Sequence, residues 1–275
     1  MSNILQDLSD PALPGAIEAN LAEEMSIFGR GLPGAALHTE PELLWFFTGK
    51  PHLNGVLLTH FATDDKAYAD ARIAEMIAYF KARHLSFGWS VGPSTLPADL
   101  ATCLEAHGFT YEGQSIALAV DIEALHAETP TLTGLIIKEI ENEGMLKVKR
   151  SLEKRGFDAS EETAQDYYDG YLASGFGKGT RWHHYIGWLN GEEVAMASLL
   201  LYMGVAGIYG VATIPEARRQ GIGAAITLHA LHAARESGYR IATLTDTEMS
   251  RGIYRRMGFQ NYCTVRHYAW SPNGE

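Results

Sequence analysis

Cysteine, long apolar runs and clustered positive charge are all scarce in this sequence of 275 residues. Its two cysteines, Cys103 and Cys263, stand far apart, which argues against a disulfide framework and a thiolate metal site. No apolar run reaches the roughly 20 residues that a membrane span needs, and residues 1–7 lack the pattern of a signal peptide. We therefore expect a globular cytoplasmic protein without a membrane partner.

The balance of charge argues against another class of partner. Lys and Arg number 22 against 33 Asp and Glu, which gives a formal net charge of −11. Nucleic-acid binding requires clustered positive charge, and no basic patch is visible outside one glycine-containing segment, so no nucleic-acid partner is predicted. The acidity suits an amine-bearing substrate, and it suits solubility equally well.

That segment, residues 218–224, reads Arg-Arg-Gln-Gly-Ile-Gly-Ala and is the most informative part of the chain. It follows an apolar strand pattern at 206–213 and opens a helical pattern. Glycines let the backbone approach a ligand closely, and the start of a helix leaves N–H groups unpaired at the positive end of its dipole. Because Arg218 and Arg219 add positive charge, the segment is predicted to bind an anionic group such as a pyrophosphate.

Two common phosphate sites fit this segment poorly. A Rossmann fingerprint has a small residue where Ile226 stands, and its glycines follow the strand directly, whereas Pro215 and other residues intervene here. Asp246 does lie at a distance suitable for that motif. A Walker A loop requires Lys and Ser or Thr after its last glycine, where this chain has Ala224 and Ala225.

The segment instead resembles motif A of the GNAT superfamily of N-acetyltransferases, R/Q-x-x-G-x-G/A, through Arg218, Gly221 and Gly223. A second stretch, Tyr254 to Phe259, is similar to the Y-x-x-x-G-F of the same family. The order of strand, glycine loop, helix, strand, tyrosine-bearing helix and final strand also agrees. The resemblance implies an α/β (α+β GNAT-type) fold that binds acetyl-CoA as cosubstrate.

The resemblance also implies site residues. The backbone of Val211, Ala212 and Thr213 would pair with the pantetheine arm. The pyrophosphate would be held by the loop and the helix start, comprising Arg218, Arg219, Gln220, Gly221, Ile222, Gly223 and Ala224. Tyr254 takes the position of the general acid that protonates the departing thiolate, since a phenol with a pKa near 10 is protonated at neutral pH. Alternatively, Tyr254 only packs against the cofactor.

The resemblance assigns no general base. Some members of the family use a glutamate on the strand before the glycine loop, where this chain has Ile208 and Tyr209. Glu248 and Asp246, at the end of the next strand, are candidates, although both also suit the capping of the following helix. Thr247 departs from the asparagine that is usual there.

The chain divides into two stretches with a similar order of elements. Residues 131–275 form the predicted acetyl-CoA-binding domain. Residues 1–125 are predicted to form a degenerate GNAT-like domain, because the order of elements is similar but 63–68 is acidic and lacks glycine where a phosphate loop is needed. Residues 123–130 form the linker. The alternative for the first half is an unrelated α/β domain.

Hydrophobic periodicity and turn residues predict the individual elements. Helices are expected over 12–28, 67–83, 98–107, 141–155, 163–173 and 222–237. Strands are expected over 43–48, 55–59, 87–91, 115–120, 135–140, 183–189, 194–201, 206–213 and 241–245, with 265–270 closing the sheet of the second half.

Two further groups of side chains have open interpretations. His183 and His184 are adjacent on a strand and so point to opposite faces, which prevents them from chelating one ion, and no metal site is predicted. Tyr167, Tyr168 and Tyr171 lie at helical spacing and suit either an acceptor pocket or the core.

The sequence therefore predicts an N-acetyltransferase that moves an acetyl group from acetyl-CoA to a primary amine of a small molecule or peptide. The alternatives are a non-catalytic acyl-CoA-binding module and a transferase that uses a different acyl donor. The chain is expected to be a monomer or a homodimer.

Overall fold

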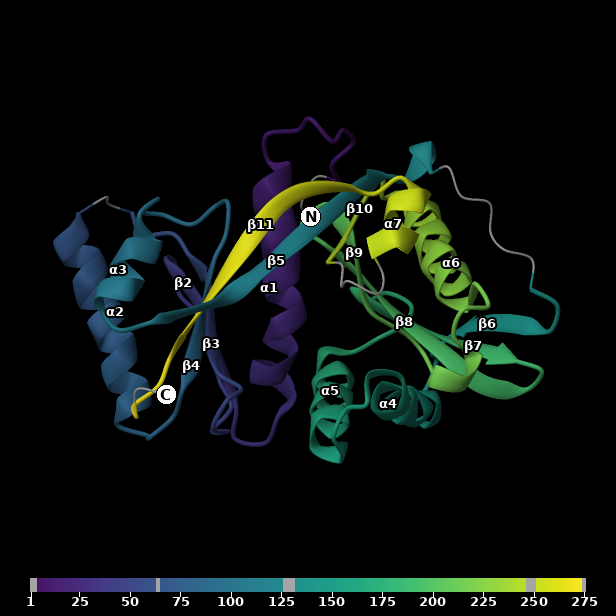
Figure 1. The fold of residues 1–275 in the computed structure, drawn as a ribbon, viewed down its shortest axis with the longest axis horizontal. Helices are drawn as coiled ribbons and strands as arrows, with labels where there is room; N and C mark the ends of the chain where they lie inside the picture. Colours follow the sequence, from purple (N-terminus) through teal and green to yellow (C-terminus); the bar gives the residue numbers. More distant parts are fainter. Residues whose placement is uncertain (1–3, 63–64, 126–131, 246–250, 274–275) are drawn as a thin grey trace.

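A single sheet of eleven strands runs through both halves of the molecule, with helices packed on its faces (Figure 1). The computed structural model describes residues 4–62, 65–125, 132–245 and 251–273. The strand order is β1-β2-β3-β4-β11-β5-β10-β9-β8-β7-β6. The expected mixed α/β class is confirmed.

The first half contains α1 (Leu13–Gly31), β1 (Ala36–Thr39), β2 (Leu43–Phe47), β3 (Gly55–Thr59), α2 (Lys66–Lys81), β4 (Phe87–Val91), α3 (Leu100–Ala106) and β5 (Thr110–Asp121). The second half contains β6 (Leu135–Glu139), α4 (Glu143–Phe157), α5 (Glu161–Ser174), β7 (Trp182–Leu189), β8 (Glu192–Tyr202), β9 (Val205–Thr213), α6 (Ile222–Glu236), β10 (Ile241–Thr245), α7 (Arg251–Met257) and β11 (Gln260–Trp270). Short 3₁₀ turns lie at Ile122–Ala124 and Pro215–Ala217. The predicted helices and strands are all present, and the short strand β1 was not anticipated.

The two halves exchange their last strands. β5 of the first half pairs antiparallel with β10, and β11 of the second half pairs antiparallel with β4. β5 and β11 lie side by side at the centre of the sheet (Figure 1). The expectation that 265–270 closes the sheet of the second half is therefore wrong, because β5 occupies the place beside β10. Alternating side chains predict that a strand exists but carry no information about a partner so distant in sequence.

Buried side chains and a capped helix lie next to the parallel strands of the first half. Its parallel pair, β3 and β4, is joined by the indole N–H of Trp89, which donates a hydrogen bond of 2.9 Å to the Thr59 hydroxyl. Trp89 and Phe61 are buried in the core of this half. The Asp65 carboxylate caps the N-terminus of α2 by accepting from the Ala67 N–H at 2.9 Å. Negative charge at this helix end disfavours a phosphate.

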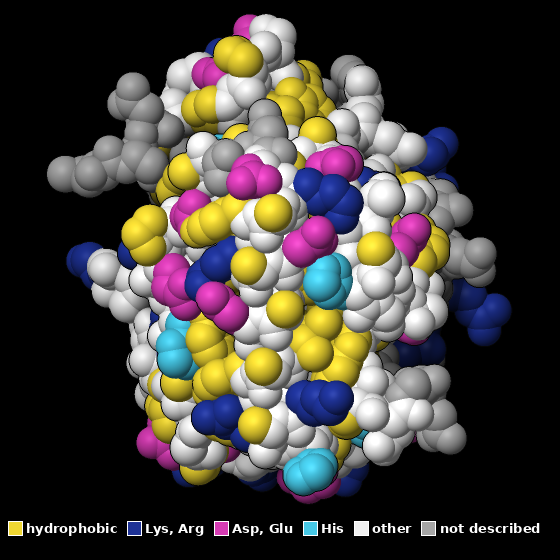
Figure 2. All heavy atoms as spheres, turned by 90° about the vertical axis from the view of Figure 1, so that its left-hand side faces the viewer, with side chains coloured by type: hydrophobic (Ala, Val, Ile, Leu, Met, Phe, Trp, Pro, Cys, Tyr) yellow, Lys and Arg dark blue, Asp and Glu magenta, His cyan; other side chains and the backbone are white. Residues whose placement is uncertain are grey.

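Charges on the outer face of the first half are mixed in sign. Figure 2 shows Lys and Arg side chains interspersed with Asp and Glu side chains on this face. Arg72 pairs with Glu40 at 2.7 Å, and Lys66 pairs with Asp70 at 3.0 Å. This face therefore presents no extended field of one sign to a partner.

Helix α1 connects the halves, since it belongs to the first half by sequence but packs against β9 and α5 of the second (Figure 1). The buried Asn20 amide donates hydrogen bonds to the carbonyls of Tyr202 at 3.0 Å and Val205 at 3.2 Å. Its oxygen accepts a bond of 2.7 Å from the Tyr209 hydroxyl. Asn20 thereby fixes α1 to the β8–β9 hairpin.

Replacing Asn20 with alanine should lower the free energy of unfolding by roughly 2–3 kcal/mol, because buried carbonyls and a buried hydroxyl lose their partner. Urea unfolding followed by circular dichroism measures this loss. Asn261→Ala is the matched control, since Asn261 is exposed, and it should change stability by less than about 0.5 kcal/mol. Equal losses in the two variants would contradict the role assigned to Asn20.

Candidate active site

Strands β9 and β10 separate at the point where a site opens between them. These parallel strands pair at Ala206–Ala242 and Gly207–Thr243 only. On its other side, β9 is irregular, because Gly210 and Val211 together stand opposite the single residue Ala197. Gly210 has a φ of +56°, which favours glycine. Such a bulge takes a backbone amide out of the ladder and makes it available to a ligand.

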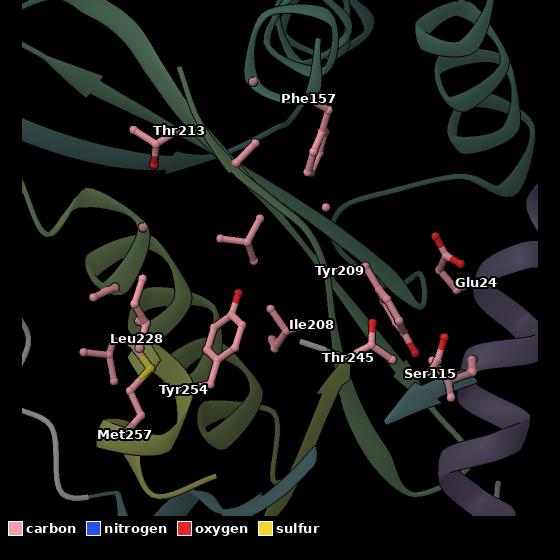
Figure 3. A pocket seen from close by; sticks show the side chains of 18 of the residues that line it. Glu24, Ser115, Phe157, Ile208, Tyr209, Thr213, Leu228, Thr245, Tyr254 and Met257 are labelled. Carbon is pink, nitrogen blue, oxygen red and sulfur yellow. The ribbon is translucent and has the colours of Figure 1, made fainter. Parts of the chain in front are cut away.

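A cavity of about 1730 Å³ begins at this opening and is lined by residues of both halves (Figure 3). Its wall includes most of the predicted cofactor residues, namely Val211, Ala212, Thr213, Arg218, Arg219, Gly221, Ile222, Gly223 and Ala224. Gln220 is exposed and is not part of this wall. The structure thus brings the strand, the glycine loop and the helix start to one space.

The glycine loop has the backbone geometry of an anion site. Gly221 is the N-cap of α6 with a φ of +83°, a left-handed conformation that side chains disfavour. The first amide bonded inside the helix is that of Ala225, which donates to the Gly221 carbonyl at 3.0 Å. The amides of Ile222, Gly223 and Ala224 precede it and have no partner within the helix, so they are available to an anion.

The guanidinium of Arg218 is hydrogen-bonded to the backbone. It donates to the carbonyl of Thr213 at 3.0 Å and to that of Gly156 at 2.8 Å. Gly156 packs so closely on β9 that a Cβ there would lie 2.7 Å from the Cβ of Ala212. Arg218 therefore ties the end of α4 to the end of β9, a structural role that its expected phosphate contact did not reveal.

The end of α4 also carries a side chain that the sequence analysis did not identify. Phe157 is 51% exposed, and its ring projects into the cavity (Figure 3). An exposed aromatic ring on a cavity wall can pack against a bound ligand. The sequence signal was only a glycine-phenylalanine pair at a helix end.

Tyr254 enters the cavity from α7. Its hydroxyl points into the cavity near Ile208, and the residue is only 7% exposed (Figure 3). Phe259 packs edge-to-face against the Tyr254 ring with centroids 5.9 Å apart. Gly258, with a φ of +103°, ends the helix so that Phe259 can fold back beneath it. The second motif thus positions the tyrosine. Glu248, Asp246 and Thr247 lie outside the described residues.

A carboxylate of the first half lines the same cavity and was missed by the sequence analysis. Glu24 projects from α1 on the far side of Tyr209 from Tyr254 (Figure 3). Burial and the nearby Glu153 raise the pKa of Glu24 to about 7, and Lys149 opposes this shift. No local motif marks Glu24, because its place in the site depends on how α1 packs against the second half.

Charge is distributed unevenly along the cavity. The cations in its described wall gather near the glycine loop and α7, and they are Arg218, Arg219 and Arg256. The carboxylates in the described wall both come from α1, and they are Glu18 and Glu24. His267, beside them, bonds to the Ser115 hydroxyl at 2.9 Å, and burial lowers its pKa so that it is neutral at pH 7. The cavity therefore has a positive end and a negative end.

The three tyrosines of α5 belong to the core. Tyr168 and Tyr171 are buried, and the ring of Tyr167 packs edge-to-face on Phe28 with centroids 5.0 Å apart. None of the three lines the cavity wall in the part of the chain that is described. Of the two interpretations, packing in the core is confirmed.

The adjacent histidines separate as the strand geometry predicts. His183 bonds to the Glu139 carboxylate at 2.6 Å, whereas His184 is buried on the other face and bonds to the Ser198 hydroxyl at 2.9 Å. Burial holds the pKa of His184 well below its usual value, so the ring is neutral. Across the described ranges, no group of three His, Cys, Asp or Glu side chains is arranged to hold a metal ion.

Because Arg218 bonds two backbone carbonyls, Arg218→Met should lower the free energy of unfolding by roughly 1.5–3 kcal/mol. Arg219→Met provides the control. Arg219 is exposed and makes no hydrogen bond within the described chain, so its loss should change stability by less than about 0.5 kcal/mol. Urea unfolding of both variants checks this, and two equal losses would show that the carbonyl contacts of Arg218 are not important.

Comparison with known proteins agrees with this geometry. The sequence model of the acetyltransferase (GNAT) family matches residues 148–259. No curated protein matches the chain. In the described residues, no helix has the length and apolar character needed to cross a membrane.

Several solved structures share the fold over nearly the whole chain. The GCN5-related N-acetyltransferase of Kribbella flavida is 20% identical, with a TM-score of 0.69 over 92% of this chain and 95% of its own. That of Sphaerobacter thermophilus is 14% identical, with a TM-score of 0.66 over 99% and 95%. A tandem GNAT protein from the clavulanic acid biosynthesis pathway is 15% identical, with a TM-score of 0.64 over 99% and 98%. Residues 148–259, in the second half, therefore match the acetyltransferase (GNAT) family, and the chain as a whole shares its fold with these structures, among them a tandem GNAT protein.

Proposed function

We propose that this protein is an acetyl-CoA-dependent N-acetyltransferase that acts on a primary amine of a small molecule or peptide. The observation that carries the proposal is the cavity, which joins the glycine loop, the β9 bulge and the Tyr254 hydroxyl in one continuous space. Binding sites for drug-sized molecules occupy about 300–1,000 Å³. A cavity of about 1730 Å³ therefore has room for a nucleotide cofactor and an acceptor together.

The wall of the cavity suits acetyl-CoA along its length. The free amides at the start of α6 would hold the pyrophosphate, because they combine unpaired N–H groups with the positive end of the helix dipole. The edge of β9 from Val211 to Thr213 lies beyond its pairing with β10 and would bond the amide groups of the pantetheine arm. Acetyl-CoA supplies an acetyl thioester. Contacts of its pyrophosphate with α6 and of its pantetheine arm with β9 would direct this thioester toward the bulge.

The bulge and Tyr254 would supply the chemical assistance. An amide released from the ladder at Gly210–Val211 would donate to the thioester oxygen as negative charge develops on it. The Tyr254 hydroxyl would give its proton to the departing sulfur. Neither role requires a covalent intermediate on the protein.

Calorimetric titration with acetyl-CoA should give a dissociation constant on the order of micromolar. Gly221→Asp should abolish this binding, because a carboxylate at the helix start repels the pyrophosphate. Gly191→Asp is the matched control, since Gly191 also has a positive φ, of +93°, but lies in an open hairpin turn away from the cavity. Wild-type protein that is folded but does not bind acetyl-CoA would refute the proposal.

Measurement of turnover tests the proposed general-acid role of Tyr254. We expect Tyr254→Phe to lower kcat by about 10²–10⁴-fold, as is usual for loss of a general acid, while the affinity for acetyl-CoA is unchanged. Release of the CoA thiol in the presence of a panel of amines measures this. Tyr111→Phe, a remote and half-exposed tyrosine on β5, should leave kcat unchanged. Full activity in Tyr254→Phe would remove the general-acid role, and binding without any turnover in the wild type would favour a non-catalytic acyl-CoA-binding module.

A further inference from the structure

Helix α1 carries three carboxylates, and they differ in what they contact. Glu18 accepts hydrogen bonds from the amide and the hydroxyl of Ser94 at 2.7 and 2.6 Å. Glu23 pairs with Arg30 at 2.8 Å and with Arg181 at 3.1 Å. Glu24, in contrast, makes no hydrogen bond or ion pair with any described residue, although it lines the cavity. Glu24 is thus the carboxylate of this helix that a ligand can engage.

We propose that Glu24, contributed by the first half, binds the ammonium group of the acceptor and takes its proton, so that the acceptor site lies between the two halves. This inference rests on the proposed acetyl transfer. It assigns to α1 a role that the side chains of β9 beside the bulge do not offer. On β9, Ile208 is apolar, and the Tyr209 hydroxyl is turned away to Asn20.

The groups around Glu24 suit a proton acceptor. On α4, Lys149 and Glu153 form a buried ion pair of 3.0 Å, so the lysine charge is already balanced. The hydroxyl-bearing rings of Tyr167 and Tyr171 approach from α5, and that of Tyr209 from β9. Burial raises the pKa of all three phenols, which are therefore neutral. With its own pKa near 7, Glu24 is ionised in part at neutral pH and is well matched to accept a proton.

The rest of the acceptor end supports a cationic ligand. Its described wall contains Glu18 and the neutral His267 but no lysine or arginine, since the cations gather near the glycine loop and α7. Leu21, Met25 and Leu57 give this end an apolar surface as well. A primary amine on an apolar chain matches both properties, because its ammonium group faces carboxylates while its carbons contact hydrophobic side chains.

The transfer step balances with Glu24 as the proton acceptor. The ammonium nitrogen loses one proton to the Glu24 carboxylate, directly or through a water molecule in the cavity. Its freed electron pair forms the C–N bond to the carbonyl carbon, and the C–S bond breaks. The sulfur takes the proton of Tyr254, which regains a proton from the same nitrogen. Glu24 then releases its proton to solvent, so that one proton is produced for each amide formed.

The test compares Glu24→Gln with Glu23→Gln, which removes a neighbouring carboxylate whose ion pairs lie elsewhere. The probes are pentylamine, 1,5-diaminopentane and a lysine-containing tripeptide. At pH 7, Glu24→Gln should lower kcat/KM by about 100-fold while acetyl-CoA binds as in the wild type. In the wild type, kcat/KM should fall as the pH decreases through about 7, because Glu24 becomes protonated. This decrease of kcat/KM at acidic pH should be absent from Glu24→Gln and present in Glu23→Gln.

The outcomes separate this inference from the proposed function. Wild-type transfer to an amine, together with an unchanged rate and pH profile in Glu24→Gln, would overturn the role of Glu24 alone. Acetyl-CoA binding without transfer to any probe would overturn the proposed function and this inference with it.

Thermal unfolding gives a second readout that requires no acceptor. The pKa of Glu24 is raised on folding from 4.5 to about 7, so its ionisation disfavours the folded state. The melting temperature of the wild type should therefore fall relative to that of Glu24→Gln as the pH rises from 5 to 8. A difference that is constant over this range would show that Glu24 does not titrate there, which would overturn the inference.

Discussion

Where β5 and β11 lie side by side, each half of the chain completes the sheet of the other, and the positions of the remaining elements depend on this pairing. The ladder runs from Gln260–Ala119 to Ala269–Thr110 and joins the halves through backbone hydrogen bonds rather than through side chains alone. With the sheet continuous, α1 can lie against β9 and place Glu24 and Asn20 at the second half. The halves therefore cannot slide or separate while the sheet is intact, and the wall of the cavity that both supply is fixed in place.

The described part of the first half lacks the features of a pyrophosphate site but contributes to the cavity beside the glycine loop. At the start of α2, a carboxylate cap replaces the free amides and positive charge that a pyrophosphate needs. Next to β3 and β4, Trp89 and Phe61 form a packed core. Its helix α1, however, supplies one wall of the cavity in the other half. The first half therefore contributes side chains to a cavity whose glycine loop belongs to the second half.

The local parts of the site could be predicted from the sequence, and the long-range parts could not. The glycine loop and the Tyr254–Phe259 stretch are short motifs whose geometry depends on residues within a few positions, such as Gly221 at a positive φ. The partner of β11 depends instead on a strand more than a hundred residues away, and alternation of side chains does not encode it. Glu24 was missed for the same reason. For Arg218, the motif predicted a phosphate contact, and only the fold revealed that its guanidinium bonds backbone carbonyls.

The strand exchange also determines when this protein can finish folding. During synthesis, the N-terminal half emerges first, but the edge of β4 stays unpaired until residues 266–270 have left the ribosome. An unpaired strand edge is a template for association with other chains, and contacts between distant segments form slowly because a long loop must first be closed. The nascent chain therefore carries an open edge from the synthesis of β4 until that of β11, and its yield in a cell depends on how well chaperones protect that edge over this interval.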